Sequence, residues 1–319
     1  MAIERQQMTA DAAPCVPRIT VVIPSFERPR QLHACLSALA DQHLPASDFE
    51  VIVVDDGSAS PPRDVVTKFA VSLPIRLIEQ RHAGPAAARN AGARAARGTH
   101  IVFTDDDCRP DPAWLTALLT IIDANPAVAI GGRIVNALPD RLYSTASQQL
   151  VDFLYRHHNG DGTDSRFLIT ANICVAQRTF IGIGGFDESF PLAAGEDRDF
   201  CERWLAAQYR MVYCPAAIVH HAHDLTLTSF CRQHFHYGCG AHHLHSARAR
   251  RGEHGFRLES LRFYRALVLS PFHAPRPRRA FVLSALLMVS QVTYAAGYAF
   301  ERWRARPSAV TDARMTPAP

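Results

Sequence analysis

Short apolar runs alternate with helix-forming segments through the first 132 residues. The runs "RITVVIP" (18–24), "FEVIVV" (49–54) and "HIVFT" (100–104) are rich in β-branched residues, which is typical of strands buried on both faces. Between them lie "RPRQLHACLSALADQ" (28–42), with leucines at helical spacing, and "GPAAARNAGARAARG" (84–98), rich in alanine. This alternation predicts an α/β protein with a mostly parallel sheet and helices on both faces.

The alternation fades after residue 132, although single elements remain recognisable. Apolar runs and helical patterns predict further strands at 75–80, 127–132, 167–177 and 210–223, and further helices from Pro112 onward, at 195–209 and at 227–250. The chain contains no internal repeat.

Composition and charge exclude some classes of protein. The 319 residues are 48% hydrophobic and 20% charged with a formal net charge of +4, so we expect a globular chain with no nucleic-acid partner. The eight cysteines form no CxxC pair, which favours a reduced cytosolic environment over a disulfide framework. The first residues lack the apolar core of a signal peptide.

Two acidic clusters each follow a predicted strand. One begins at Asp55 in "DDGS", and the other contains Asp105, Asp106 and Asp107 in "FTDDDC". Ligands of open α/β sheets bind beyond the carboxyl ends of the strands, so the two clusters predict one shared site. Mg²⁺ or Mn²⁺, which prefers carboxylate oxygens, would offset the repulsion among three adjacent acids. The alternative for the triplet is a solvated turn.

Two further groups of residues could complete such a site. Glu196 and Asp197 open a predicted helix, where they act either as a general base beside a pocket or simply as acids that suit the helix dipole. His220, His221 and His223 end an apolar strand, and a neutral imidazole can complete a metal shell.

Five stretches, in this order along the chain, resemble family 2 glycosyltransferases with the A-type glycosyltransferase fold. They are "VVIPSFERPRQLHACLSAL", "VIVVDDGS", "GPAAARNAGARAARGTHIVFTDDDC", "GGFDESF" and "GEDRDFCERWLAAQYRMVYCPAAIVHH". The similarity covers roughly residues 18–240. It implies transfer of a sugar from a nucleotide-sugar donor, with inversion, to the hydroxyl of a carbohydrate, lipid-linked or small-molecule acceptor.

The resemblance implies donor-binding roles for residues that follow the first strands. They are Pro24, Ser25, Glu27, Asp55, Asp56, Arg89, Asn90, Asp105 and Asp106. Among them, Asp56 is expected near the nucleobase. The family more often has Asn or Tyr where this chain has Phe26 and Glu27, so the detailed nucleobase contacts stay open.

The resemblance also implies a metal site and a catalytic base. Asp105 and Asp107 match the outer acids of the DxD motif, which face the ribose and a divalent cation, Mg²⁺ or Mn²⁺. His221 matches a histidine that joins the metal shell in some members. Asp197 matches the base that takes the proton from the acceptor hydroxyl, and Glu196 lies beside it.

The resemblance and the composition together suggest a division of the chain. We expect a flexible leader at 1–17, a catalytic domain at 18–250 with a nucleotide-sugar-binding half (18–132) and an acceptor-binding half (133–250), a helical segment at 251–304 and a flexible tail at 305–319.

Two other functions fit parts of the sequence. A sugar nucleotidyltransferase would use a similar sheet, but it needs a glycine-rich loop after the first strand, and "PSFERPR" has no glycine. A zinc-organised binding module could form at 231–245, where Cys231 and Cys239 each precede a histidine by three residues.

The C-terminal stretch "AFVLSALLMVSQVTYAAGYAF" (280–300) contains no charged residue and is long enough to span a membrane. Basic residues flank it on both sides, and "LRFYRALVLSPF" (261–272) is basic and apolar like a helix in a membrane surface. We expect membrane attachment on the cytoplasmic side through this segment. The alternative is a helix packed on the catalytic domain.

Overall fold

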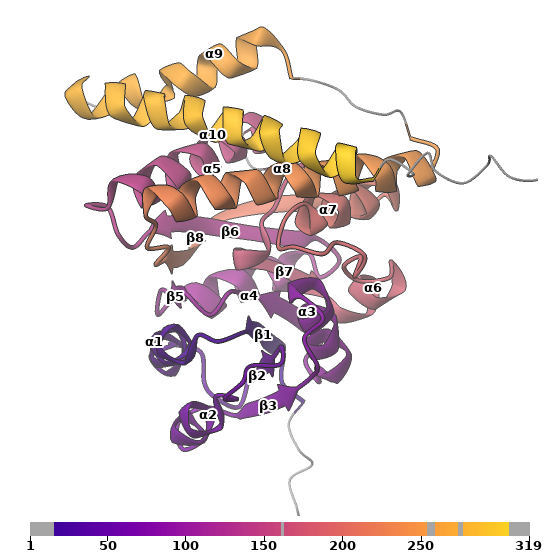
Figure 1. Cartoon of the computed structure of the whole chain (residues 1–319). Helices are drawn as coiled ribbons and strands as arrows, with labels where there is room; N and C mark the ends of the chain where they lie inside the picture. Colours follow the sequence, from indigo (N-terminus) through magenta and orange to yellow (C-terminus); the bar gives the residue numbers. More distant parts are fainter. Residues whose placement is uncertain (1–15, 161–162, 254–258, 274–276, 306–319) are drawn as a thin grey trace, which may run out of the picture.

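An eight-stranded sheet forms the centre of the computed structural model, which describes residues 16–160, 163–253, 259–273 and 277–305 (Figure 1). Its strands are β1 (Ile19–Ser25), β2 (Phe49–Asp55), β3 (Ile75–Glu79), β4 (His100–Phe103), β5 (Cys108–Pro110), β6 (Ala129–Asn136), β7 (Ile173–Ala176) and β8 (Met211–His221). Their order across the sheet is β3-β2-β1-β4-β7-β6-β8-β5.

The first half of the sheet is parallel and the second half is mixed. β1 lies between β2 and β4 and runs parallel to both, and β3 runs parallel to β2. β7 is antiparallel to its neighbours β4 and β6, and β5 is antiparallel to β8, whereas β6 and β8 are parallel. The predicted α/β class is confirmed, with more antiparallel pairing in the second half than the alternation indicated.

Helices cover both faces of this sheet. They are α1 (Pro29–Ala40), α2 (Arg63–Phe69), α3 (Pro85–Ala95), α4 (Trp114–Ala124), α5 (Leu142–Asn159), α6 (Gln177–Gly182), α7 (Glu196–Ala206), α8 (Leu227–Arg250), α9 (Leu261–Leu269) and α10 (Pro277–Arg304). α1, α2 and α4 pack on one face, and α3, α6 and α7 pack on the other. α5, α8, α9 and α10 form a further layer beyond β6 and β8 (Figure 1).

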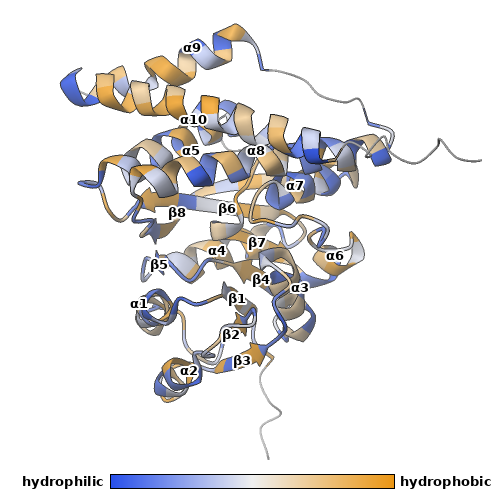
Figure 2. Ribbon diagram, viewed as in Figure 1, coloured by the Kyte–Doolittle hydropathy of each residue, from blue (hydrophilic) through white to orange (hydrophobic). Residues whose placement is uncertain are grey.

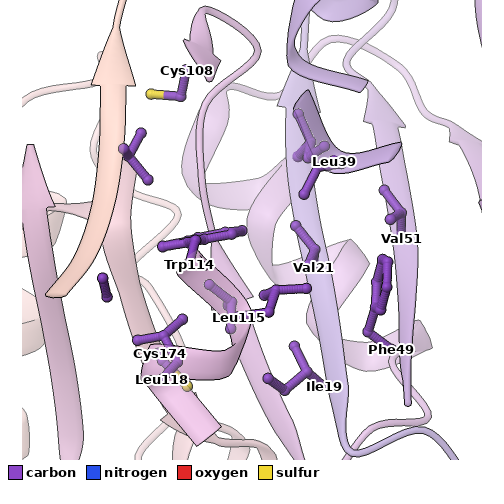
Figure 3. Close-up of a cluster of buried hydrophobic side chains, with 14 of the residues drawn as sticks. Ile19, Val21, Leu39, Phe49, Val51, Cys108, Trp114, Leu115, Leu118 and Cys174 are labelled. Carbon is purple, nitrogen blue, oxygen red and sulfur yellow. The ribbon is translucent and has the colours of Figure 1, made fainter. Parts of the chain in front are cut away.

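The alternating side chains of β1 show why most of its sequence is apolar. Ile19 and Val21 point into the cluster that contains Trp114 and Leu118 of α4, as Figure 3 shows. Val22 belongs to the cluster on the opposite face. Because successive strand residues face opposite sides and both sides are covered, most positions carry apolar side chains, and the buried Thr20 hydroxyl has a partner in Glu50.

Some predicted elements differ from the structure. The strand expected at 167–177 is confined to β7, because a 3₁₀ turn (Thr170–Asn172) precedes it. The Asn172 side chain is fully buried there, where it accepts a hydrogen bond from Trp114 Nε1 and donates one to the Ala217 carbonyl. The helices α2 and α5 were not predicted. Most of the expected leader and tail lies outside the described residues.

The C-terminal helices are held by close backbone contact. A Cβ atom on Gly238 of α8 would collide with the carbonyl oxygen of Tyr294 in α10, and one on Gly297 of α10 would collide with that of Phe235. Only glycine fits where two helix backbones approach this closely. α10 is therefore fixed against α8, and α9 lies beside it (Figure 1).

Candidate active site

The acidic clusters converge because their strands are neighbours. β2, β1 and β4 lie side by side and run parallel, so their carboxyl ends meet at one edge of the sheet. Ser25 at the end of β1 pairs in register with Asp55 at the end of β2, and its hydroxyl donates to Asp106 Oδ2 at 3.0 Å. The shared site predicted from the two clusters therefore forms.

Each acid of the triplet has a different partner. Arg89 Nη2 lies 2.8 Å from Asp105 Oδ1, and His221 Nε2 lies 3.1 Å from Asp107 Oδ1. Arg28 Nη1 lies 3.3 Å from Asp106 Oδ1 and 3.2 Å from Asp107 Oδ2. These cations offset much of the repulsion that three adjacent carboxylates would otherwise suffer.

Burial and charge separate the pKa values of the triplet. Burial raises the pKa of Asp106 to about 7, against the opposing charge of Arg28. Burial would also raise the pKa of Asp107, but the hydrogen bond and charge of His221, with Arg28, hold it well below its usual range. Conversely, Asp107 raises the pKa of His221 although burial opposes this. Asp107 is therefore ionised at neutral pH.

One group of residues in the described part of the chain has metal-site geometry. The ligand atoms of Asp107, Cys108 and His221 all lie within 4.8 Å of one another. Pairing of β5 with β8 places Cys108 opposite His221 in the sheet. Burial raises the pKa of the Cys108 thiol well above its ordinary value, so the thiol is protonated in the metal-free protein. An ionised carboxylate and an imidazole remain, which suit a cation that prefers oxygen and nitrogen ligands.

Asp56 is held by the loop that precedes α3. Its carboxylate accepts hydrogen bonds from Gln80 Nε2 at 2.7 Å and from the backbone N–H groups of Ala83 and Gly84, each at 2.9 Å. The His82 ring lies 3.0 Å from Asp56 Oδ2, and its centroid is 4.5 Å from that of Phe26. Phe26 is exposed, so this ring pair gives the loop an aromatic face.

Arg89 also connects the triplet to the acids of α7. This guanidinium is almost fully buried, and its Nη1 lies 3.1 Å from Glu196 Oε1. Gly195 precedes Glu196 with a φ of 92°, a conformation that favours glycine, and packs close to the Gly240 carbonyl of α8. Asp197 is less buried than Glu196, and its carboxylate accepts from the Arg198 N–H at 2.7 Å.

Glu196 and Asp197 both have raised pKa values. Burial, followed by the charge of Asp197, raises the pKa of Glu196 to about 7 in spite of Arg89. Burial also raises the pKa of Asp197. Glu196 Oε2 is buried without a hydrogen-bond partner. Acids with perturbed pKa values beside a cleft are candidates for proton transfer.

Most predicted site residues line a single cleft of about 820 Å³. The predicted residues that it brings together are Pro24, Ser25, Asp56, Arg89, Asp105, Asp106, Asp107, Glu196, Asp197 and His221. Glu27, Asp55 and Asn90 do not line it. Asn90 is buried and donates to the Phe186 carbonyl at 2.8 Å, so it ties α3 to the turn before α7. Any contact of these three with a donor stays a prediction.

Sequence reasoning assigned no role to several residues of the cleft. Arg28 bridges two acids of the triplet, and its only sequence signal was its position in the loop after the first strand. Cys108 is the third member of the possible metal site with Asp107 and His221, and His82 lies against Asp56. Each of these contacts depends on pairing between distant segments, which a local pattern does not reveal.

The helix that holds the predicted zinc module has other contacts. Cys239 Sγ lies 3.4 Å from the Gly297 carbonyl, and the His234 and Phe230 rings meet in a T-shaped contact with centroids 4.4 Å apart. Residues 231–245 are all described, and no three ligand atoms among them lie close enough to hold an ion. The cysteines serve the packing of α8 instead.

Comparison with known proteins adds a family and several relatives. The model described as glycosyl transferase family 2 matches residues 20–181. Glycosyltransferase AglE of Haloferax volcanii is 28% identical over 201 residues, which cover 62% of this chain and 64% of that protein. Pre-mycofactocin glycosyltransferase of Mycobacterium tuberculosis is 31% identical over 235 residues, covering 70% of this chain and 46% of that protein. The chain thus spans less than two thirds of the length of these relatives.

Solved structures share the fold at low identity. A mannosyltransferase from Pyrobaculum calidifontis, PcManGT, in complex with GDP-Man and Mn²⁺, matches with a TM-score of 0.60 and 16% identity, covering 94% of this chain and 92% of that chain. S. aureus TarS 1-349 in complex with UDP-GlcNAc matches with a TM-score of 0.52 and 18% identity, covering 90% and 91%.

The raised pKa of Glu196 predicts a pH-dependent stability. Below a pH of about 7 the folded protein holds a proton that the unfolded chain releases near its ordinary pKa of 4.5, so this group stabilises the fold less as pH rises through that window. Chemical denaturation of metal-free protein should therefore show a smaller fall in unfolding free energy between pH 5 and 8 for Glu196→Gln than for the wild type. Asp64→Asn, on the exposed side of α2, is the control; equal falls in all three proteins would contradict the assignment.

Proposed function

The chain belongs to glycosyl transferase family 2, and from this premise we propose that it transfers a sugar from a nucleotide-sugar donor to an acceptor hydroxyl with inversion. The observation that carries the proposal is the meeting of the acid triplet, His221 and the α7 acids in one cleft. The A-type glycosyltransferase fold expected from the resemblance is confirmed by the fold of the solved neighbours, and two of these hold GDP-Man with Mn²⁺ or UDP-GlcNAc.

A divalent cation, Mg²⁺ or Mn²⁺, would be held by Asp107 and His221, with Asp105 facing the ribose or the cation. The low pKa of Asp107 keeps this ligand ionised, and carboxylate oxygens are the ligands that Mg²⁺ and Mn²⁺ prefer. When bound, such a cation neutralises negative charge on the diphosphate that leaves. Arg28 and Arg89 bring additional positive charge to the same part of the cleft.

The donor would lie along the carboxyl ends of the first strands. Pro24 and Ser25 end β1, Asp55 ends β2, and Glu27 lies in the loop after β1. Asp56 and the Phe26–His82 ring pair lie beside them. An aromatic face suits a nucleobase, since every base has a π-face. Arg89 and Asn90 anchor α3 against the triplet and against the turn before α7, and Asp106 is held by Ser25.

Asp197 would act as the general base. It lines the cleft from a rigid helix start, and its raised pKa brings it closer to the working pH. It takes the proton of the acceptor hydroxyl while the hydroxyl oxygen attacks the anomeric carbon from the face opposite the leaving diphosphate. The bond from the anomeric carbon to the acceptor oxygen forms as the bond to the leaving diphosphate breaks. Because the attack comes from the opposite face, the anomeric centre inverts. Glu196, held by Arg89, would fix the position of its neighbour.

A sugar nucleotidyltransferase is less well supported. The family model spans the first strands and the triplet, and the loop after β1 lacks the glycine-rich phosphate cradle that this alternative needs. AglE and the pre-mycofactocin enzyme, which resemble this chain, are both named glycosyltransferases.

Asp107→Asn should abolish the metal-dependent part of nucleotide binding, because the substitution preserves size but removes a charged ligand. Calorimetric titration of UDP and GDP with and without Mn²⁺ measures this directly. His221→Ala should also weaken Mn²⁺ binding. His220→Ala is the matched control, since His220 adjoins it on β8 but does not line the cleft. Unchanged Mn²⁺-dependent affinity in Asp107→Asn would make the triplet a structural turn.

Asp197→Asn should leave nucleotide binding intact and lower turnover by about 10²–10⁴, the usual contribution of a general base. Release of nucleoside diphosphate from a donor sugar in the presence of acceptor reports turnover, and calorimetry reports binding. Asp199→Asn is unsuitable as a control, because Asp199 pairs with Arg203 and Arg251 inside the fold. Parallel losses of binding and turnover in Asp197→Asn would indicate a helix-capping role instead.

We also propose that the C-terminal segment attaches the protein to a membrane, on its cytoplasmic side. α10 is long and apolar enough to cross a membrane, and 39% of its most apolar window is buried in the protein (Figure 2). Its outward side chains are apolar at helical spacing: Phe281, Ala285, Met288, Val292, Ala299 and Trp303 are all exposed. One face of α10 therefore packs on α8, and the other has no partner within the described structure, which supports the proposal.

The outer face of α10 should bind lipid. Full-length protein should float with vesicles that contain anionic lipid, and Phe281→Asp with Val292→Asp should reduce the floated fraction about tenfold, since each change places a charge in an apolar surface. Val71→Asp is the matched control, because Val71 is 96% exposed in the loop between α2 and β3, at the amino ends of the parallel strands and far from α10 (Figure 1). Wild-type protein that stays with the soluble fraction would contradict membrane attachment.

A further inference from the structure

The cleft extends well beyond the acid triplet. Its far half is lined by α5, α8, α9 and α10, and none of the donor-binding residues lies there. Its total volume of about 820 Å³ is near the upper end of the roughly 300–1,000 Å³ typical of ligand sites. The far half therefore offers room for a second substrate beside the donor.

The walls of this far half are apolar. Leu150, Val151 and Leu154 of α5 line it, and so do Phe263 and Tyr264 of α9, which packs directly against α5. Leu150, Leu154 and Tyr264 are half-buried and pack around a core formed by Phe153, Phe263, Leu267 and Leu287. Aliphatic side chains that flank a cleft favour an apolar ligand, because they offer no hydrogen bonds.

The floor of the far half is polar and incompletely bonded. Gln233 Oε1 and His234 Nε2 of α8 are buried with no hydrogen-bond partner, and His234 is only 1% exposed. Both residues line the cleft. Burial lowers the pKa of His234 to about 4, so its ring is neutral and suits hydroxyl groups better than anions. Buried polar atoms without partners are costly, and a bound ligand would satisfy them.

The polar floor continues to the proposed base. Gln233 Nε2 donates to the Tyr237 hydroxyl at 2.5 Å. Desolvation, followed by the charges of Asp197 and Glu196, raises the pKa of Tyr237 to about 12, so this phenol lies within the field of both acids. Gln233, His234 and Asp197 all line the cleft, so a hydroxyl group bound over the floor shares this space with the proposed base.

We propose that the far half of the cleft binds an amphiphilic acceptor, with a hydroxyl-rich head over Gln233 and His234 and an apolar chain along the wall that α5 and α9 form together. This inference rests on the proposed function, because it names the acceptor of that reaction. The helices that roof the cleft support it: Gln291 and Tyr294 of α10 line it from within, while the outer face of the same helix is apolar and exposed. A chain anchored in a membrane would thus reach the site along these helices.

The proposal predicts that affinity depends on chain length. Glucose and the n-butyl, n-hexyl and n-octyl β-glucosides, all below their micelle concentrations, are titrated into full-length protein that holds UDP or GDP and Mn²⁺. Affinity for the glucoside should rise about fourfold for each methylene that enters the far half of the cleft. Leu154→Asp, or Leu154→Gln if the first variant does not fold, should remove this dependence and leave nucleotide binding unchanged.

Val292→Asp is the matched control, because Val292 lies on the outer face of α10 and does not line the cleft. It should keep the full dependence on chain length. Equal affinity across the series, or a dependence lost in Val292→Asp but kept in Leu154→Asp, would overturn the proposal. Failure of UDP and GDP to bind with Mn²⁺ would instead contradict the proposed function, and the glucoside series on nucleotide-free protein would still report on the far half of the cleft.

Discussion

The buried guanidinium of Arg89 connects parts of the site that are distant in the sequence. It pairs with Asp105 after β4 and with Glu196 at the start of α7, so three elements share one charge. A buried cation is costly unless its partners have good geometry, and the loss of one partner leaves an uncompensated charge. The contact therefore fixes the position of the acid triplet relative to the α7 acids. It thereby sets the distance between the proposed donor site and the proposed base.

The sheet makes this contact possible. Both faces of β1, β2 and β4 are covered by helices, which holds the strands in register and brings their carboxyl ends to one edge. β5 then turns back antiparallel to β8 and places Asp107 and Cys108 beside His221. At the other end of the cleft, Gly238 and Gly297 allow α10 to approach α8 closely enough to form a roof. The same fold thus supplies a polar donor end and an apolar far end.

Sequence patterns predicted the parts that depend on local order. The strands before Asp55 and Asp105, the helix that begins at Glu196 and the long helix at 227–250 lie within a few residues of their predicted positions. Neighbouring parallel strands then made the convergence of the acid clusters foreseeable. Local patterns could not predict features that depend on which distant segment packs against them. These are the antiparallel strand β5, the contacts of Arg28 and the burial of the Asn90 side chain. The same holds for the far half of the cleft, whose walls come from helices more than a hundred residues apart in the chain.

A thermal-shift screen of nucleotide-sugars and nucleoside diphosphates, each with Mn²⁺, with Mg²⁺ and with chelator, tests the central claim most directly. A ligand that binds only the folded protein stabilises it by about 2.7 kcal/mol at a hundred times its dissociation constant, which is several degrees in melting temperature for most domains. The account predicts that at least one nucleotide series raises the melting temperature, and that chelator removes most of the rise. A panel in which no nucleotide stabilises the protein with either cation would contradict a metal-dependent nucleotide-sugar site in this cleft.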